Sequence, residues 1–319
     1  MWLPVLALIF GFVTLVWSAD RFVNGSAVTA KNLGMSKLLI GLTVVALGTS
    51  VPEILVALAA TVAGNPLLAI GNALGSNIAN IGLVLGITAL VAPLPFAPGV
   101  LRSELPWLMG ATLAALIVLF DLEVGPWDSV FLLIGLGLIL LRLLREQKKH
   151  PELIDDSLAE LEEIPDVSTR LGLFWLLSGL VVLLASAEVL VWAAVAIAET
   201  LGVSELIIGL TIVAVGTSLP ELAATIGSAL KGHPDIAIGN VVGSNILNIL
   251  AVLAVPGLIT TTSLHAAVLW RDYGMMLALT LLLVLFAYGM GSRALITKFE
   301  GGVLVLSWLG YNLLLYYHA

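Results

Sequence analysis

The sequence predicts an all-α polytopic membrane protein with about ten transmembrane helices, arranged as two inverted repeats of five helices each. Three observations lead to this prediction. Of the 319 residues, 60% are hydrophobic and only 11% are charged. Apolar blocks long enough to span a bilayer follow one another along the chain, with one charged stretch near the middle. The two halves of the chain also share the same polar motifs in the same order.

The composition excludes several classes of protein. A soluble domain is usually about 25% charged, so an ordinary soluble enzyme or a disordered chain is excluded. The net charge of −8 argues against nucleic acid as a partner, because phosphate binding needs basic patches. The chain has no cysteine, so it has no disulfide or thiolate metal site. We therefore expect a lipid bilayer as the partner of this chain, and neither a cofactor nor an enzymatic activity.

An internal repeat fixes the architecture. The motif Gly-Thr-Ser-x-Pro-Glu ends at Glu53 and again at Glu221, and Gly-Ser-Asn-Ile-x-Asn ends at Asn80 and again at Asn248, each 168 positions later. Without a gap, 26 of the 52 positions at 40–91 equal their partners at 208–259. Because Thr, Ser, Pro, Glu and Asn match in register, apolar composition alone does not explain the similarity.

Apolar blocks and the repeat together place each helix. In the first half, helices are predicted at 3–30, 37–63, 67–91, 104–121 and 128–144. In the second half, they are predicted at 171–198, 205–229, 236–258, 267–288 and 300–317. The first helix of each half carries a matching acidic residue, Asp20 or Glu188, which favours a retained helix over a cleaved signal peptide at the start of the chain. The two motifs then lie in the second and third helices of each half.

Domain organisation and orientation follow from the charges. We expect a first repeat at 1–145, an acidic linker at 146–169 and a second, inverted repeat at 170–319. With the linker in the cytoplasm, both termini lie outside, and every Lys and Arg except Arg271 falls on the cytoplasmic side. The odd number of helices per half makes the two repeats point in opposite directions across the membrane.

The most informative residues are Glu53 and Glu221. A carboxylate at the centre of a bilayer costs about 2.5–3.5 kcal/mol on insertion scales. Two such residues, related by the repeat and each placed directly after a proline, are hard to explain as contacts between helices alone. Pro52 and Pro220 remove a backbone N–H, and a broken helix at this depth exposes carbonyls that can coordinate ions.

Other oxygen donors surround these carboxylates in the sequence pattern. Thr49 shares a helix face with Glu53, and Thr217 shares one with Glu221. In the third and eighth helices, spacing of four puts a serine and an asparagine on one face: Ser76 with Asn80, and Ser244 with Asn248. Freed carbonyls are expected near Ala46, Leu47, Ala214 and Val215. The predicted centre contains no His, Lys or Arg, and such an all-oxygen set favours a hard cation, with Ca²⁺ taking about 6–8 ligands.

These two motifs resemble the α-1 and α-2 repeats of the calcium/cation antiporter superfamily, and the closest branch is the prokaryotic sodium/calcium exchangers that include YrbG-like members of the inner membrane. The resemblance covers essentially the whole chain. It implies ten helices with discontinuous helices 2, 3, 7 and 8, a prokaryotic inner-membrane location, and exchange of Ca²⁺ for Na⁺. It also implies that helices 1 and 6 slide as a gate.

The resemblance assigns roles to matching positions. Glu53 and Glu221 would bind Ca²⁺ and share Na⁺. The hydroxyl or carbonyl oxygens of four further residues would contribute ligands: Thr49, Ser50, Thr217 and Ser218. Ala46 and Ala214 would donate carbonyls to outer Na⁺ sites. The ring would be completed by Ser76, Asn80, Ser244 and Asn248.

One position departs from the resemblance. Many sodium/calcium exchangers carry Asp where this chain has Asn248, which leaves the centre with two carboxylates and makes the stoichiometry an open question. The coupling ion is also open: Ca²⁺/H⁺ and K⁺-dependent exchange are alternatives, and a passive cation channel is a further one. Gly-Thr-Ser-x-Pro-Glu favours Na⁺, because the proton-coupled branch typically has Gly-Asn-Ala-x-Glu instead. No obligatory protein partner is evident.

Mechanistically, the sequence suggests competition for one site. Ca²⁺ and Na⁺ would need the same carboxylates, and only a loaded, nearly neutral site would cross the membrane centre. For Asp20 and Glu188, a structural or gating role is favoured over direct ligation. Asn72 and Asn240 are equally compatible with supporting the ligands and with hydrogen bonding between helices.

Overall fold

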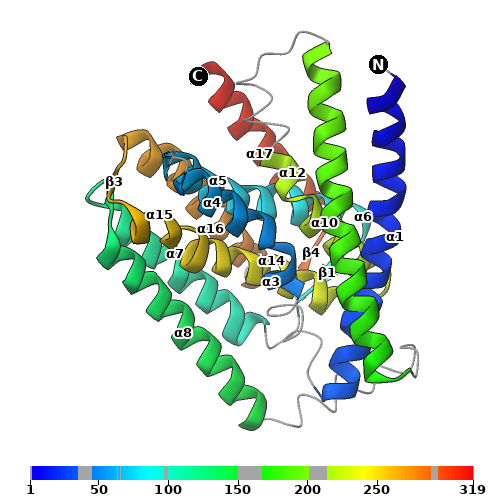
Figure 1. Ribbon diagram of the computed structural model, residues 1–319. Helices are drawn as coiled ribbons and strands as arrows, with labels where there is room; N and C mark the ends of the chain where they lie inside the picture. The colour runs from blue at the N-terminus through cyan, green and yellow to red at the C-terminus, as the bar shows by residue number, and fades with distance from the viewer. Residues whose placement is uncertain are drawn as a thin grey trace.

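The structure is a computed structural model that describes residues 2–34, 45–62, 64, 66–96, 100–149, 167–200, 214–288 and 294–318. The expected helix beginnings at 37–44 and 205–213 lie outside the described residues, as does most of the linker expected at 146–169. Within the described ranges the chain is almost entirely helical (Figure 1). Each expected helix has a counterpart there whose described ends lie within a few residues of the prediction.

The first half contains the helices α1 (Trp2–Leu33), α3 (Ala46–Thr49), α4 (Val51–Val62), α5 (Pro66–Ala79), α6 (Gly86–Val91), α7 (Leu105–Leu119) and α8 (Pro126–Lys149). The second half contains α10 (Thr169–Thr200), α12 (Ala214–Thr217), α13 (Leu219–Leu230), α14 (Pro234–Leu247), α15 (Ala254–Ile259), α16 (Gly274–Tyr288) and α17 (Lys298–His318). Within the part of the chain that the structure describes, π-helical segments precede or join some of these: η2 (Asn80–Leu85), η3 (Val100–Glu104), η6 (Asn248–Val252) and η7 (Val268–Tyr273).

The third and eighth helices differ from the expectation of a break. Both continue across the expected break, α5–η2–α6 from Pro66 to Val91 and α14–η6–α15 from Pro234 to Ile259, with a π-helical segment in the middle and a turn at Leu253 in the eighth helix. No proline stands within η2 or η6, although Pro256 follows η6 by four residues. A π turn accommodates an extra residue while the backbone groups stay paired, so the helix changes direction without opening.

Six of the described helices are long and apolar enough to cross a membrane. They are Trp2–Leu33, Pro66–Val91, Val100–Leu119, Thr169–Ser186, Pro234–Ile259 and Val268–Tyr288. The two that contain η2 and η6 form the centre, because 78% of each apolar window is buried, against 24% for α1. Large apolar side chains on α1 and α10, such as Phe10, Trp17 and Phe174, are exposed, as expected for helices that face lipid.

Two short ribbons connect the halves of the chain. β1 (Leu94–Pro95) pairs antiparallel with β4 (Leu295–Ile296), and β2 (Glu123–Val124) pairs antiparallel with β3 (Thr262–Ser263). Each ribbon therefore takes one strand from the first half and one from the second. β1 and β3 are 168 positions apart, which is the offset of the sequence repeat.

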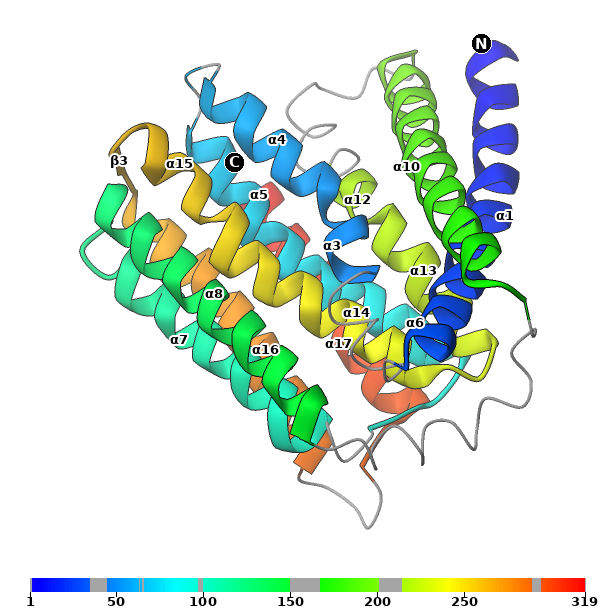
Figure 2. The same cartoon turned by 60° about the horizontal axis from the view of Figure 1, so that its bottom comes forward.

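The helices α1 and α10 form a closely packed pair along one side of the molecule (Figures 1 and 2). Their backbones approach at glycines. A Cβ on Gly25 would overlap the backbone of Leu176, and a Cβ on Gly179 would lie 2.6 Å from the backbone nitrogen of Phe22. Only a residue without a side chain fits at either position, so the two helices contact each other backbone to backbone.

We expect Gly25→Ala to destabilise the protein by about 1–3 kcal/mol or more, because the added methyl group meets backbone atoms that have no room to move. Without this contact, alanine would stabilise the helix by about 1 kcal/mol relative to glycine. A loss of stability in the variant would therefore show that the backbones touch at Gly25. Thermal unfolding in detergent measures it. Gly110→Ala on α7 is the matched control, since nothing lies within 4 Å of a Cβ there; equal stability of the two variants would contradict the backbone contact.

Candidate functional site

The candidate site begins at two interrupted helices. α3 stops at Thr49 and α4 starts at Val51, and α12 stops at Thr217 and α13 starts at Leu219. The serines at the interruptions have nearly the same backbone angles: φ −84° and ψ 5° for Ser50, and φ −88° and ψ 2° for Ser218. The proline two residues after each serine lacks the N–H that would continue the helical ladder, so the motif itself produces the interruption.

The two carboxylates lie in the first turns of α4 and α13. Glu53 and Glu221 are both completely buried. Ser50 Oγ of the first half donates a hydrogen bond of 3.3 Å to Glu221 Oε1 of the second. Ser50 stands three residues before Glu53, so this bond brings the two repeated motifs into direct contact. The tertiary structure therefore joins two motifs that are far apart in the sequence.

Most of the carboxylate oxygens have no hydrogen-bond partner in the described part of the chain. This applies to both oxygens of Glu53 and to Oε2 of Glu221. Ser76, also buried, lies on α5. Buried polar atoms are nearly always paired, and an unpaired buried charge is costly. These oxygens are therefore available to a cation.

Buried amides and hydroxyls accompany the carboxylates. Asn80 and Asn248 begin the π-helical segments η2 and η6, are fully buried, and have no hydrogen-bond partner for either amide atom among the described residues. Ser218 Oγ is also buried without a partner there. Leu253 N donates to Asn248 O at 2.9 Å, the wider ring of a π turn. The amide oxygens of Asn80 and Asn248 and the hydroxyl of Ser218 are therefore also available to a cation.

A hydrogen-bond network holds the interrupted helices in place. Thr49 Oγ1 lies 3.1 Å from Asn240 Oδ1 and 3.5 Å from Ser244 Oγ, and both of these residues lie on α14. Asn240 Nδ2 donates to Thr225 Oγ1 at 2.9 Å and to the carbonyl of Glu221 at 3.4 Å. This network joins a helix of the first half to helices of the second.

The first half repeats part of this arrangement. Asn72 Nδ2 donates to the carbonyl of Glu53 at 3.3 Å, just as Asn240 does to Glu221. Each asparagine thus fixes the backbone of the carboxylate residue in its own half. The sequence left these two asparagines open between supporting the ligands and linking helices, and the contacts show that they link helices at the carboxylate positions.

The backbone carbonyls that were expected to be free for ions make different numbers of hydrogen bonds. Ala46 O accepts hydrogen bonds from Ser50 N at 3.0 Å and from Thr49 Oγ1 at 3.3 Å, and Val215 O accepts one from Ser218 N at 3.1 Å. Ala214 begins α12. Both carbonyls are thus used inside the chain in this conformation. Ala46 O would have to give up one of its two hydrogen bonds to bind an ion, whereas Val215 O could use its second lone pair.

Sequence reasoning missed three buried residues. Thr225 completes the Asn240 network, and its partner position in the first half is Ala57, so the repeat gave no signal for it. Asn77 and Asn245 are buried, and Asn77 Oδ1 and both amide atoms of Asn245 have no partner in the described chain. Their identity at an offset of 168 within Gly-Ser-Asn-Ile was the available signal.

The donor set determines which ions fit. Among the described residues, no group of three or more His, Cys, Asp or Glu side chains could hold a metal. The buried, unpaired atoms of the candidate site are carboxylate, hydroxyl and amide groups, whose oxygens suit Ca²⁺ or Na⁺ better than transition metals. Glu53 and Glu221 also lie in the first turns of α4 and α13, where the backbone N–H groups favour anionic side chains.

We expect Thr49→Val to lower ion transport by about tenfold, because it leaves a buried Asn240 oxygen without its hydrogen-bond donor. Thr49→Ser keeps the hydroxyl and should retain most of the rate. The control is Thr61→Val on α4, whose buried hydroxyl bonds only the carbonyl of Ala57 one turn earlier among the contacts of the described residues. Initial rates of ion uptake into proteoliposomes are measured for the three variants. An equal loss of rate in Thr61→Val would contradict a specific role for the Thr49 hydroxyl.

Comparison with known proteins gives consistent results. A family described as sodium/calcium exchanger protein matches residues 3–145 and 171–317 of this chain. The putative antiporter CaxA of Alkalimonas amylolytica is 43% identical over 319 residues, covering 99% of both chains. The inner membrane protein YrbG of Escherichia coli is 39% identical, covering 97% of this chain and 96% of its own. A solved structure of the sodium-calcium exchanger NCX_Mj, soaked with Na⁺ and Ca²⁺, matches with a TM-score of 0.81 at 32% identity, covering 96% of each chain.

Proposed function

The chain belongs to the sodium/calcium exchanger protein family, as the repeated motifs indicated, and from this premise we propose that it exchanges Ca²⁺ for Na⁺ across a membrane through one shared site. Members of this family are membrane cation exchangers and not enzymes. The transported ions are the cargo, and no resident cofactor is part of the proposal. The proposal includes the coupling ion, the residues that bind the ions, and the way in which the site is exposed to each side of the membrane in turn.

One observation carries the proposal. Glu53 and Glu221, one from each half, are fully buried, and Ser50 beside Glu53 bonds Glu221, yet three of the four carboxylate oxygens have no hydrogen-bond partner among the described residues. Two buried negative charges without compensation are strongly unfavourable. One Ca²⁺ or two Na⁺ would neutralise them, and the buried amides of Asn80 and Asn248 offer further oxygens.

The proposed ligand set is the one expected from the sequence. Glu53 and Glu221 would bind Ca²⁺ and share Na⁺, and the remaining oxygens would come from hydroxyl, amide and carbonyl groups near them. These are Thr49, Thr217, Ser50, Ser218, Ser76, Ser244, Asn80, Asn248, Ala46 and Ala214. The interhelical contacts of Thr49 and Ser50 support this grouping, since both join the first half to the second.

The proposed architecture is ten helices in two inverted repeats, at 1–145 and 170–319, separated by a cytoplasmic linker at 146–169. Two features of the described chain support it. Each ribbon pairs strands of opposite halves, with β1 and β3 168 positions apart, and the two interrupting serines have matching backbone angles. Such repeats place an ion site between them, near the middle of the membrane.

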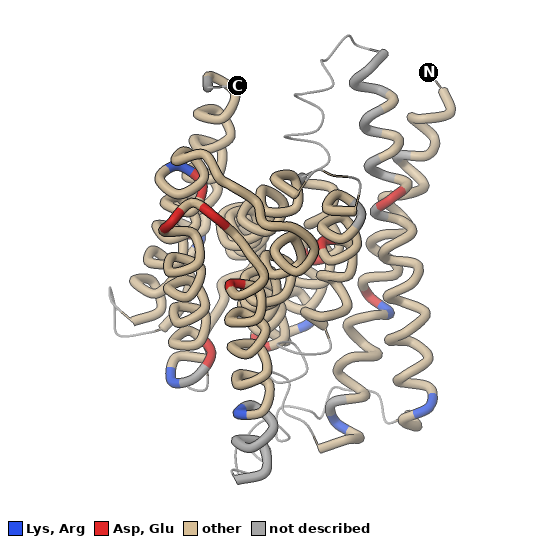
Figure 3. Tube along the Cα trace, turned by 60° about the vertical axis from the view of Figure 1, so that its left-hand side comes forward, with Lys and Arg blue, Asp and Glu red and all other residues tan. Residues whose placement is uncertain are grey.

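The proposed orientation rests on the charges. Most of the Lys and Arg positions in Figure 3 lie toward the lower end of the molecule, while several acidic positions lie between the two ends. Cytoplasmic loops carry the excess of Lys and Arg in membrane proteins. We therefore place the lower end in the cytoplasm, both termini outside, and the protein in the inner membrane of a prokaryotic cell.

In the proposed mechanism, alternating access follows from competition. Ca²⁺ and Na⁺ require the same two carboxylates, so one must leave before the other binds. A loaded site is nearly neutral, whereas an empty one carries about two uncompensated charges and is disfavoured from closing inside the membrane. Return without an ion is thereby suppressed, and the two fluxes are coupled.

The test is uptake of radioactive calcium into proteoliposomes loaded with Na⁺. We expect uptake when the outside is free of Na⁺, and none when Na⁺ is equal on both sides. Uptake driven instead by a proton gradient, or only in the presence of K⁺, would replace Na⁺ by that ion in the proposal. Calcium flux that needs no counter-ion at all would indicate a channel and refute exchange.

A further inference from the structure

The pair of helices α1 and α10 meets the rest of the molecule along few elements. Besides α10, α1 packs mainly against α13, and α10 packs against α3, α12 and α13. These are the interrupted helices that carry or precede Glu53 and Glu221. Any movement of the pair that opens a path to the site must therefore change its contact with α13.

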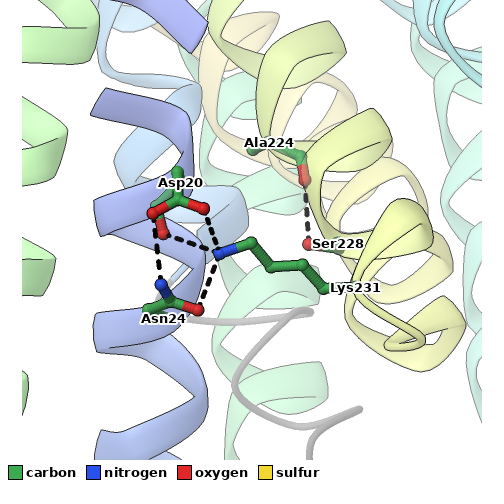
Figure 4. Close-up of polar contacts among 5 residues, drawn as sticks. All are labelled: Asp20, Asn24, Ala224, Ser228 and Lys231. Atoms are coloured by element: carbon green, nitrogen blue, oxygen red, sulfur yellow. Dashed lines mark hydrogen bonds and ion pairs between the residues drawn. The ribbon is translucent and has the colours of Figure 1, made fainter. Parts of the chain in front are cut away.

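A polar cluster joins α1 to the end of α13 (Figure 4). Lys231, directly after α13, forms an ion pair of 2.5 Å with Asp20 Oδ1 on α1. Its Nζ also donates to Asn24 Oδ1 at 2.7 Å and to the backbone carbonyl of Asp20 at 3.2 Å. Asn24 Nδ2 in turn donates to Asp20 Oδ2 at 3.2 Å. One lysine thus satisfies two side chains and a carbonyl of the neighbouring helix.

The chain builds this cluster in one half only. At the repeat offset of 168, Asp20 corresponds to Glu188, Asn24 to Trp192 and Lys231 to Ala63. The turns that follow are equivalent, since Gly64 and Gly232 both have positive φ, 85° and 73°. The sequence therefore keeps the acidic residue in both first helices but has the lysine at the equivalent position of one half only.

We propose that Lys231, Asp20 and Asn24 form a one-sided latch that holds α1 against α13 at the cytoplasmic end and so favours the state in which that end is closed. The proposal rests on the exchange function proposed above, because alternating access requires the ends to open in turn. Since the repeat puts an alanine at the position equivalent to Lys231, the latch residues are not duplicated, and the two closed states differ in stability. The side chains are 23% exposed for Lys231 and 50% exposed for Asp20, so water competes with the ion pair and the bias is modest.

The latch is tested through cysteine accessibility, since the natural chain contains no cysteine. A single cysteine replaces Ser228, which is buried on α13 one turn before Lys231. The full-length protein in proteoliposomes is treated with a membrane-impermeant maleimide from the cytoplasmic side. We expect Lys231→Gln to raise the labelling rate about two- to fivefold, and Asp20→Asn to do the same.

Three further variants make the result specific. Lys231→Arg keeps the charge and should label close to the parent rate. Combining Asp20→Asn with Lys231→Gln should label no faster than either change alone, because both remove one interaction. Glu188→Gln changes the corresponding acid of the second half, where the sequence position equivalent to Lys231 is an alanine, and should leave the rate unchanged.

The proposal is overturned if Lys231→Gln labels at the parent rate, if the two single effects add, or if Glu188→Gln raises labelling equally. Gly227→Cys serves as a second reporter, because a Cβ there would meet Val23 of α1 at an ordinary 3.6 Å. If both reporters stay unlabelled in every variant, α1 does not leave α13 and no latch exists. Labelling needs no ion gradient, so absent calcium uptake in the parent protein would refute the exchange function and leave this result intact.

Discussion

Replacing Glu221 with glutamine is expected to lower Na⁺-driven Ca²⁺ uptake by at least about 100-fold, and Glu53→Gln should do the same. Both side chains are fully buried and supply the negative charge of the site. Removing one partner of a buried charge set costs about 3–5 kcal/mol, which corresponds to about a hundredfold or more in affinity. Glutamine keeps the size and one oxygen, so the change acts mainly on charge.

Two measurements separate loss of binding from loss of folding. Initial uptake rates in proteoliposomes give the transport defect, with Glu123→Gln on β2 as the control because that carboxylate is exposed on a short ribbon. Thermal unfolding in detergent without Ca²⁺ should be unchanged or improved in the two site variants, since they remove one of two buried charges. Uptake above about a tenth of the parent rate in either variant would be incompatible with the proposed site.

Asn248→Asp is expected to make calcium transport depend on the membrane potential. The unaltered site has two carboxylates, which balance one Ca²⁺ or two Na⁺, so exchange moves no net charge in the proposed mechanism. A third carboxylate at this fully buried position requires another cation. Each elementary charge moved across 100 mV contributes about 2.3 kcal/mol, or about a 50-fold change in calcium accumulation at equilibrium.

The potential is set with a potassium gradient and valinomycin, and omission of the ionophore controls for an effect of potassium itself. Asn248→Ser keeps an oxygen, adds no charge and should remain insensitive to the potential. If the parent protein already responds as strongly as the Asp variant, two carboxylates do not set the charge moved in a cycle.

Some features of the fold were predictable because they depend on local chemistry. The interruptions before Glu53 and Glu221 follow from prolines, whose missing N–H acts within a few residues whatever surrounds it. The spanning helices follow from apolar length, since a backbone in lipid must satisfy its own hydrogen bonds. In the third and eighth helices, π-helical segments stand where the resemblance implied breaks. A π turn leaves few traces in a sequence, so this feature was not predictable.

Other features depended on contacts between distant segments. The hydrogen bonds of Thr49 with Asn240 and of Ser50 with Glu221 span 191 and 171 residues, and no periodicity encodes which of several buried hydroxyls meets which partner. Thr225 entered the network without a repeat partner to mark it. Asp20 was expected to have a structural or gating role, but its partner Lys231 lies 211 residues away, and nothing in either local sequence pairs them.

By itself, the sequence determined that this chain lies in a membrane, repeats itself, and carries two acidic residues where lipid would exclude them, because composition, register and the cost of a buried charge can all be read from residue identity. Only the tertiary structure decided that Ser50 of one motif bonds Glu221 of the other, that most of the carboxylate oxygens stay unpaired in the described chain, and that Lys231 ties α1 to α13. Those outcomes depend on how helices from different halves pack, and packing is set by the shape of many surfaces together and not by any one segment.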